Sequence, residues 1–292
     1  MSALAEAVER VWPGREARFE VLGGGITNHN VKVELDREVY VLRVAGKDTG
    51  LLGIDRHVEL EATRAAAAAG IGPEVVAFVE PEAWLVTRFV AGEIPPLERM
   101  REPDMLARVA GSLRAFHDGP SIPGRFDAFR VVETYRTTTL ERGGGVPDEF
   151  DWAHGIAARI ERLRGDAVPR PCHNDLLNAN FLDDGERLRI VDWEYAGMGD
   201  LFFDLANFSI NHELGRKARE ALLLAYSGEM RREEVHALDL MRFMSDFREA
   251  MWGVVQTSVS ELDFDFAAYA AEHFERLERT AAEQAFGSAL GA

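Results

Sequence analysis

The first part of the chain alternates short apolar runs with one long amphipathic stretch. Residues 19–22, 31–35 and 39–44 are apolar runs of strand length, and three consecutive glycines separate the first two. Residues 57–69 are rich in alanine and glutamate with helical spacing, and they stop at Gly70, which is typical of a helix end. This pattern predicts a small antiparallel sheet crossed by one helix.

A break in the pattern follows two further apolar runs. Residues 75–79 and 84–90 are predicted to be strands, and the segment 91–96 then carries a glycine and two adjacent prolines. Glycine and proline are the strongest local breakers of regular structure. We therefore expect an N-terminal lobe over residues 1–90 and a C-terminal lobe over residues 91–292.

Helical spacing dominates the rest of the chain. Residues 103–117 and 148–163 are predicted helices, helices resume from Leu201, and an amphipathic helix is expected over residues 1–12. Residues 180–192 instead contain two short apolar strands joined by an Asp-Gly turn, which predicts a hairpin. The whole pattern predicts an α+β fold with a small N-terminal sheet plus helix and a larger, mainly helical C-terminal lobe.

Composition narrows the class of protein. Of 292 residues, 47% are apolar and 28% charged, and no apolar run approaches the ~18 residues of a membrane helix. A formal net charge of −17 disfavours nucleic acid and anionic membrane surfaces as partners. The acidic start has no basic segment of a secretory signal, so a cytoplasmic location is expected. The single Cys172 excludes an internal disulfide and leaves oxygen as the ligand type for a metal.

One spacing carries specific chemistry. His173-Asn174-Asp175, four further residues and then Asn180 form the pattern of a kinase catalytic loop, and Asp192 ends an apolar strand twelve residues later. In that pattern the first aspartate accepts the proton of the substrate hydroxyl, while Asn180 and Asp192 hold Mg²⁺. Each residue alone is also explained by a turn or a capping role. Their common spacing around a hairpin favours phosphoryl transfer.

Upstream of this loop lies a candidate phosphate-binding turn. Glycines between two strands let backbone amides approach phosphates, and nearby hydroxyl or amide groups add hydrogen bonds. An ordinary glycine-rich hairpin turn has the same composition. The candidate residues are Gly24, Gly25, Thr27 and Asn28.

A charged residue interrupts the third apolar strand. Arg43 is the odd residue there, and it can contact the ATP phosphates while pairing with a glutamate of the following helix. Glu59 is the expected partner, with Glu61 second, although an arginine at a sheet edge can also extend to solvent. Adenine is expected against the hinge around residues 87–90, which includes Thr87 and Phe89.

These motifs resemble the choline/ethanolamine kinases, within the wider aminoglycoside-phosphotransferase group of protein-kinase-like folds. The resemblance covers nearly the whole chain. It implies that Asp175 is the catalytic base, that Asn180 and Asp192 bind magnesium, and that Asp204 braces the catalytic loop. It rests on Gly24-Gly25-Ile26-Thr27-Asn28, Leu42-Arg43, Glu59, Gly70-Ile71-Gly72-Pro73, Cys172 to Asn180, Ile190 to Tyr195, Phe203 to Asn207 and Trp252-Gly253.

Binding of choline requires aromatic rings, because a quaternary ammonium group has no hydrogen-bond donor and is held by cation–π attraction and nearby carboxylates. The resemblance places Asp175, Glu194, Tyr195, Trp252, Phe264 and Tyr269 around such an acceptor. Where eukaryotic choline kinases have a second tryptophan, this chain has Val255. The alternative for these aromatics is ordinary core packing between helices.

The sequence therefore predicts an enzyme that transfers the γ-phosphate of ATP, with Mg²⁺, to a small cationic alcohol, first of all choline. One alternative is the same fold acting on ethanolamine, thiamine, an aminoglycoside or a sugar. Another is an inactive pseudokinase, although Asp175, Asn180 and Asp192 are all present. His117 is expected to be structural rather than catalytic.

Overall fold

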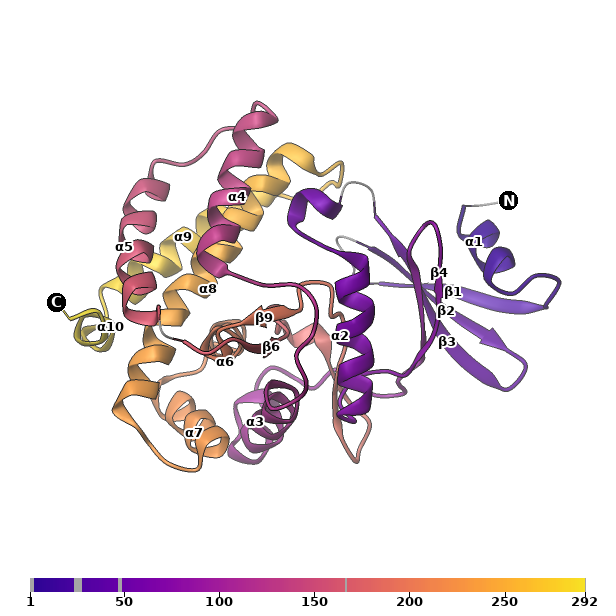
Figure 1. Ribbon diagram of the computed structural model, residues 1–292, viewed down its shortest axis with the longest axis horizontal. Coiled ribbons are helices and arrows are strands. Elements are labelled where there is room, and N and C mark those ends of the chain that lie inside the picture. Colours follow the sequence, from indigo (N-terminus) through magenta and orange to yellow (C-terminus); the bar gives the residue numbers. More distant parts are fainter. Residues whose placement is uncertain (1–2, 24–27, 47–48, 166, 292) are drawn as a thin grey trace.

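An antiparallel sheet forms the first part of the computed structural model, which describes residues 3–23, 28–46, 49–165 and 167–291. Its strands pair in the order β1-β2-β3-β5-β4 (Figure 1). Alternate side chains of β2 and β3, namely Val31, Val33, Leu35, Tyr40 and Leu42, are buried, since successive residues of a strand face opposite sides. The predicted small sheet is confirmed. The strands are β1 (Ala17–Leu22), β2 (Asn28–Leu35), β3 (Glu38–Ala45), β4 (Val75–Val79) and β5 (Trp84–Arg88).

Helices flank this sheet. α1 (Ala3–Val11) packs against β3. α2 (Arg56–Ala68) begins after Asp55, whose carboxylate accepts two backbone N–H groups of the first turn, and it ends before Gly70 at φ +75°. Figure 1 shows α2 between the sheet and the helical part of the molecule. Buried alanines of α2 join the core of that helical part, so the two regions share one packed boundary.

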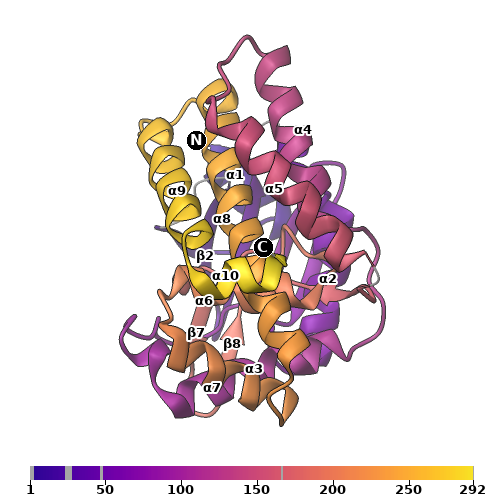
Figure 2. The ribbon, with the colours of Figure 1, turned by 90° about the vertical axis from the view of Figure 1, so that its left-hand side faces the viewer.

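The remainder is mainly helical, as predicted, and it is organised around one long helix. α8 (Arg232–Val259) is buried continuously from Ala237 to Gln256 and packs against α4, α6 and α9. Figure 2 shows α9 and α5 on either side of it. The other helices are α3 (Pro103–His117), α4 (Ala128–Glu141), α5 (Glu149–Arg164), α6 (Leu201–Asn211), α7 (Arg216–Ser227), α9 (Phe266–Ala281) and α10 (Gln284–Leu290).

Helix α4 has no counterpart among the sequence-based predictions. Its second half contains three consecutive threonines, which are poor helix formers. Two features compensate: the Asp127 carboxylate accepts the N–H groups of Phe129 and Arg130, and the buried face of the helix packs on α8. Tertiary packing therefore outweighs local propensity here.

Short strands frame the loop that carries the predicted catalytic residues. β6 (Arg170–Cys172) pairs with β9 (Gly197–Gly199), and β7 (Phe181–Asp183) pairs with β8 (Leu188–Ile190). The predicted hairpin is thus confirmed. Its turn is closed by Asp183 and Asp184, whose carboxylates accept backbone N–H groups of the turn.

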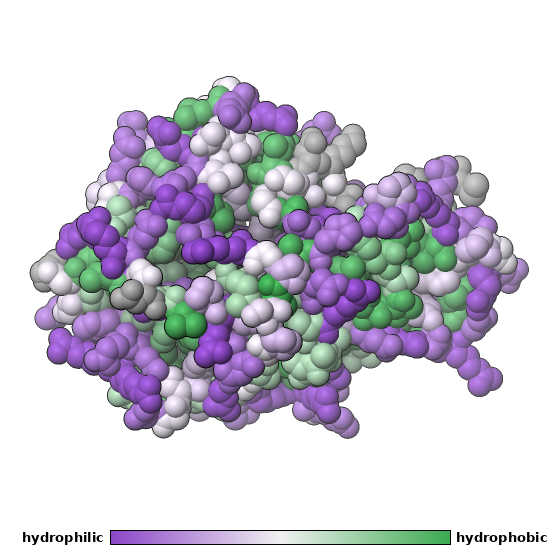
Figure 3. All heavy atoms as spheres, in the orientation of Figure 1, coloured by the Kyte–Doolittle hydropathy of each residue, from purple (hydrophilic) through white to green (hydrophobic). Residues whose placement is uncertain are grey.

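The surface is polar over most of the face seen in Figure 3, where hydrophilic side chains dominate the periphery and hydrophobic ones gather beside α2 and the sheet. Among the residues that the structure describes, no helix combines the length and the apolar character needed to cross a membrane.

A buried histidine ends α6. His212 stacks on Phe208 with ring centroids 4.0 Å apart, and its Nδ1 donates to the carbonyl oxygen of Phe208 at 2.8 Å. Burial lowers the pKa of His212 to about 4, because the charged imidazolium loses its hydration. The histidine is therefore neutral in the folded protein at neutral pH.

This histidine should make stability depend on pH. The unfolded chain binds more protons than the folded one between pH 6.5 and about 4, so stability falls as the pH is lowered through that window. Between pH 7 and 5 we expect the wild type to lose about 2 kcal/mol more than His212→Gln, whose amide can still donate to the Phe208 carbonyl. Urea unfolding at both pH values measures this difference. Equal losses in the two proteins would contradict the assignment.

Candidate active site

One buried carboxylate holds the segment that follows β6. Asp204 of α6 is fully buried, and its two oxygens accept the backbone N–H groups of His173 and Asn174 at 2.8 and 2.7 Å. Nε2 of His117, from α3, lies 3.0 Å from the same carboxylate. The bracing contact expected of Asp204 is present, and His117 contributes to the same structural cluster.

Asp175 follows directly after this anchored pair and is only 9% exposed. Nδ2 of Asn180 donates to the backbone oxygen of Asp175 at 2.8 Å and lies 3.5 Å from its Oδ2. Burial raises the pKa of Asp175 to about 8, and the nearby cation of Arg248 opposes that increase. The predicted aspartate and asparagine therefore meet on one short, tightly held loop.

Asp192 reaches the same place from the far end of the β7–β8 hairpin. The Val191 N–H donates to the carbonyl oxygen of Asn180 at 2.9 Å, so Asn180 and Asp192 lie close across the hairpin. Asp192 has φ +69°, a left-handed conformation that costs free energy in a residue other than glycine and is frequent at functional sites. Both side chains line one cavity and supply oxygen atoms, which Mg²⁺ prefers as ligands. The pair fits a magnesium site.

Arg43 ties this hairpin to the N-terminal sheet. Its guanidinium forms a short ion pair with Glu59 of α2 and lies 2.7 Å from Oδ1 of Asp192. Burial opposes the charge of Arg43, but the neighbouring carboxylates, first Asp192, outweigh it and raise its pKa. Glu61, the second candidate partner, pairs instead with Arg64 on the helix surface. The expected pairing of Arg43 with Glu59 is therefore present.

Glu194 joins the same ionic network from the other side. Nη1 of Arg56, at the start of α2, lies 2.7 Å from Oε2 of Glu59 and 3.1 Å from Oε2 of Glu194. Sequence reasoning placed Glu194 beside the acceptor; in the structure its carboxylate also faces α2. The network thus runs from Asp192 through α2 to the residue that precedes Tyr195.

A cavity of about 360 Å³ opens between the sheet and the β7–β8 hairpin. Its polar lining includes Arg43, Glu59 and Thr87 on one side and Asn180 and Asp192 on the other. Apolar walls beside such charged groups suit a flat base attached to phosphates. The apolar lining includes Val41, Leu85, Phe89, Ile94 and Leu182.

The predicted glycine-rich turn lies only partly within the described residues. Gly24, Gly25 and Thr27 lie outside the described residues, and Asn28 is the first residue of β2. Gly23, which directly precedes them, lines the cavity. A phosphate-binding role for the turn stays a prediction.

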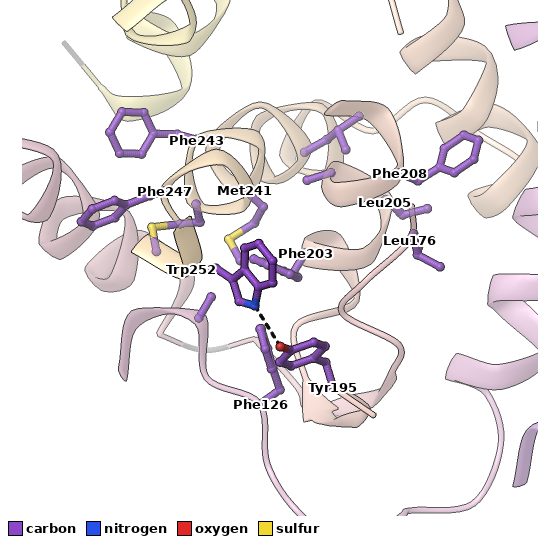
Figure 4. Packing of buried hydrophobic residues seen from close by; sticks show 14 of the residues in the cluster. Phe126, Leu176, Tyr195, Phe203, Leu205, Phe208, Met241, Phe243, Phe247 and Trp252 are labelled. Atoms are coloured by element: carbon purple, nitrogen blue, oxygen red, sulfur yellow. Dashed lines mark hydrogen bonds between the residues drawn. The ribbon is translucent and has the colours of Figure 1, made fainter. Parts of the chain in front are cut away.

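The predicted acceptor aromatics come together between α8 and α9. Figure 4 shows Trp252 pointing toward Tyr195, and its Nε1 donates to the Tyr195 hydroxyl at 3.0 Å. The Tyr269 ring lies 5.5 Å from that of Trp252, and the Phe264 ring 6.2 Å from that of Tyr269. Val255 is fully buried nearby on α8. The rings form one cluster, from which Phe264 is 48% exposed to solvent.

Arg248, one turn before Trp252 on α8, has no counterpart in the sequence-based predictions. Its guanidinium carbon lies 4.3 Å from the centroid of the Tyr195 ring. Its Nη1 lies 3.4 Å from Oδ1 of Asp175 and 2.5 Å from Oε1 of Glu249. The signal that could have revealed it is an Arg-Glu pair within a helix segment rich in apolar residues, because buried charges are rare unless they are paired and often mark a functional site.

Glu249 completes this cluster. It is buried, accepts the hydroxyl of Tyr269 at 3.0 Å and pairs with Arg248. Burial opposes ionisation of this carboxyl, but Arg248, His273 and the Tyr269 hydroxyl outweigh it and lower the pKa of Glu249. Glu249 is therefore a carboxylate at neutral pH.

A separate cavity of about 240 Å³ lies beside Tyr195, and residues of α2 and α4 form part of its wall. Its lining includes Tyr135, Glu194 and Tyr195.

Comparisons with known proteins identify the family of this chain. Residues 18–236 match the model of the phosphotransferase enzyme family. Protein LicA of Haemophilus influenzae is 26% identical over 84% of this chain and 75% of its own, and a probable ethanolamine kinase of Arabidopsis thaliana is 26% identical over 86% and 76%. The solved structure of a choline/ethanolamine kinase family protein from Mesorhizobium loti is 29% identical, with a TM-score of 0.84, over 100% of this chain and 98% of its own.

The fold prediction is confirmed by these similarities, since the chain follows a solved kinase-family structure along its whole length. The family match spans most of the sheet and the loop that holds Asp175, Asn180 and Asp192. The chain therefore belongs to the phosphotransferase enzyme family, and within it resembles the choline and ethanolamine kinases.

Proposed function

We propose that this protein transfers the γ-phosphate of magnesium-bound ATP to the hydroxyl group of a small amino alcohol, with choline as the first candidate. One observation supports the proposal most strongly: Asp175, Asn180 and Asp192 lie close together on an anchored loop and the adjoining hairpin. The cavity beside them is lined by Arg43, which pairs with Asp192. Phosphoryl transfer needs this combination of a proton acceptor, oxygen ligands for magnesium and a cation for the phosphates.

In this proposal the nucleotide occupies the 360 Å³ cavity. The N-terminal lobe, residues 1–90, covers it, with adenine near Thr87 and Phe89 and the phosphates near Arg43. Residues 91–292 supply the catalytic loop and the acceptor site. Asn180 and Asp192 would hold magnesium, which neutralises charge on the phosphates when bound.

The acceptor binds on the other side of Asp175. Its hydroxyl donates a hydrogen bond to the Asp175 carboxylate, which orients the oxygen for in-line attack and accepts its proton. Holding both reactants in this geometry, rather than forming a covalent enzyme intermediate, supplies most of the rate enhancement. The amine of the acceptor lies toward the rings of Tyr195, Trp252 and Tyr269, where cation–π attraction favours it.

Ethanolamine is the second candidate acceptor. Val255 stands where the resemblance expects another tryptophan, so the aromatic surface available to three methyl groups is smaller than in a complete cage. The similarity to a probable ethanolamine kinase supports the same candidate.

The test is ADP release by the purified protein with MgATP and each of four acceptors: choline, ethanolamine, thiamine and an aminoglycoside. We expect the greatest kcat/KM with choline or ethanolamine, and turnover of both lowered by at least about 10²-fold in Asp175→Asn. Turnover confined to thiamine or the aminoglycoside would contradict the proposed acceptor class. Nucleotide binding without turnover of any acceptor would favour an inactive, nucleotide-binding protein.

A further inference from the structure

The acceptor side of the site already contains a cation. Arg248 is 1% exposed, and its guanidinium lies over the Tyr195 ring at 4.3 Å, within the range of cation–π attraction. The same group contacts the carboxylates of Asp175 and Glu249. One aromatic face and two carboxylates therefore surround a positive charge that belongs to the chain itself.

These partners are the ones that a free ammonium group would need. A quaternary ammonium ion is held by aromatic faces and by carboxylates within a few ångströms, because it has no hydrogen-bond donor. Asp175 and Tyr195 were predicted to surround the acceptor, and Glu249 is linked to a third predicted residue through the Tyr269 hydroxyl. The guanidinium thus makes the contacts that sequence reasoning assigned to a ligand.

We propose that Arg248 is a specificity-determining residue that fills the cation position of the acceptor site and competes there with a positively charged acceptor. The inference rests on the proposed function and refines it, because it concerns the charge that an acceptor alcohol can carry. A charged amine must displace the guanidinium or share its carboxylates with it. A neutral alcohol of the same shape meets no such competition.

The ionic surroundings explain why this cation is stable in its position. Glu249 and Asp175 together carry two negative charges when ionised, and a buried carboxylate without a partner is costly. Nε and Nη2 of Arg248 have no hydrogen-bond partner within the described part of the chain, so the guanidinium is held mainly by Nη1 and the Tyr195 ring. A competing cation of higher affinity can therefore replace it without breaking a saturated hydrogen-bond network.

The deciding experiment compares choline with its neutral isostere, in which carbon replaces the quaternary nitrogen. Dissociation constants for both are measured by calorimetry on the wild type, Arg248→Met and Arg242→Met, in each case saturated with magnesium and a non-hydrolysable ATP analogue. Arg242 is a matched control, because it is a buried arginine of the same helix whose partner is Glu283. We expect Arg248→Met to bind choline about tenfold or more tightly than the wild type, with the isostere changed by less than about threefold.

The ratio of the dissociation constants for choline and its isostere distinguishes this inference from a structural role of Arg248, because a general loss of packing would weaken the binding of both ligands alike. An unchanged choline-to-isostere ratio in folded Arg248→Met would overturn the inference and direct the acceptor amine elsewhere, for example to the cavity beside Glu194. Should that variant fail to fold, the wild type decides: the inference requires that it bind choline no more than about threefold better than the isostere.

The experiment also distinguishes failure of this inference from failure of the proposed function. Suppose that Arg248→Met binds choline more tightly but the wild type turns over neither choline nor ethanolamine. The proposed reaction would then be contradicted, while Arg248 would still be the cation that occupies the acceptor position. Rapid turnover of choline or ethanolamine by the wild type, together with an unchanged choline-to-isostere ratio in Arg248→Met, would support the proposed reaction and contradict the role of Arg248.

Discussion

Asp175→Asn is expected to lower kcat by about 10²–10⁴-fold, because the amide cannot accept the proton of the acceptor hydroxyl. Nucleotide affinity should change little, since Arg43 lies on β3 and Asp192 follows β8, and the two keep their mutual ion pair. ADP release measures the first quantity, and titration with a fluorescent ATP analogue measures the second. The fold should be retained, because the loop is anchored through the backbone of His173 and Asn174 rather than through Asp175.

Asp184→Asn is the matched control for this substitution. Asp184 lies in the turn of the adjacent hairpin, and its Oδ1 accepts backbone N–H groups that an asparagine oxygen can also accept. The kcat of Asp184→Asn should therefore match that of the wild type. Substantial turnover by Asp175→Asn, or an equal loss in Asp184→Asn, would remove Asp175 from the role of proton acceptor.

Asp204→Asn is expected to destabilise the protein by about 3 kcal/mol and to lower activity as well. The carboxylate uses both oxygens for the N–H groups of His173 and Asn174, whereas an amide offers one oxygen and turns its NH₂ group toward a donor. A buried N–H group without an acceptor costs about 1–3 kcal/mol, and the contact with His117 is weakened too. Urea denaturation monitored by tryptophan fluorescence measures the loss of stability.

Asp200→Asn, at the start of the same helix, serves as the comparison. Its carboxylate caps the helix through the Phe202 N–H and pairs with Arg164 nearer the surface. Asparagine is also a good N-cap residue, so a loss of about 1 kcal/mol or less is expected. If the two variants lost equal stability, Asp204 would be an ordinary helix residue and not the anchor of the catalytic loop.

The spacing of residues along the chain was sufficient where chemistry depends on local structure. Asp175, Asn180 and the Asp-Gly turn lie within one loop and one hairpin, so their relative placement follows from a few backbone conformations. The pairing of Arg43 with Glu59 was also predictable, because a strand residue and the first turn of the next helix have few alternatives for ion pairing in that small region.

Contacts between distant segments could not be predicted in this way. Helix α4 was missed because its threonines have weak helix propensity and its stability comes from packing on α8. The pairing of Arg56 with Glu194 joins residues far apart in the chain, and its geometry depends on how α2 packs against the helical part. Local patterns contain no information about such packing.

The class of fold, the order of the catalytic motif and the set of aromatic residues available to an acceptor were predictable from the sequence. The cation beside the Tyr195 ring was not, because it comes from a distant helix. Arg248 lies 73 residues after Asp175 in the chain, and α8 must pack against α6 before the guanidinium can reach the loop. The charge of the proposed acceptor site therefore results from long-range packing, since burial and proximity, not residue type alone, set the strength of an electrostatic interaction.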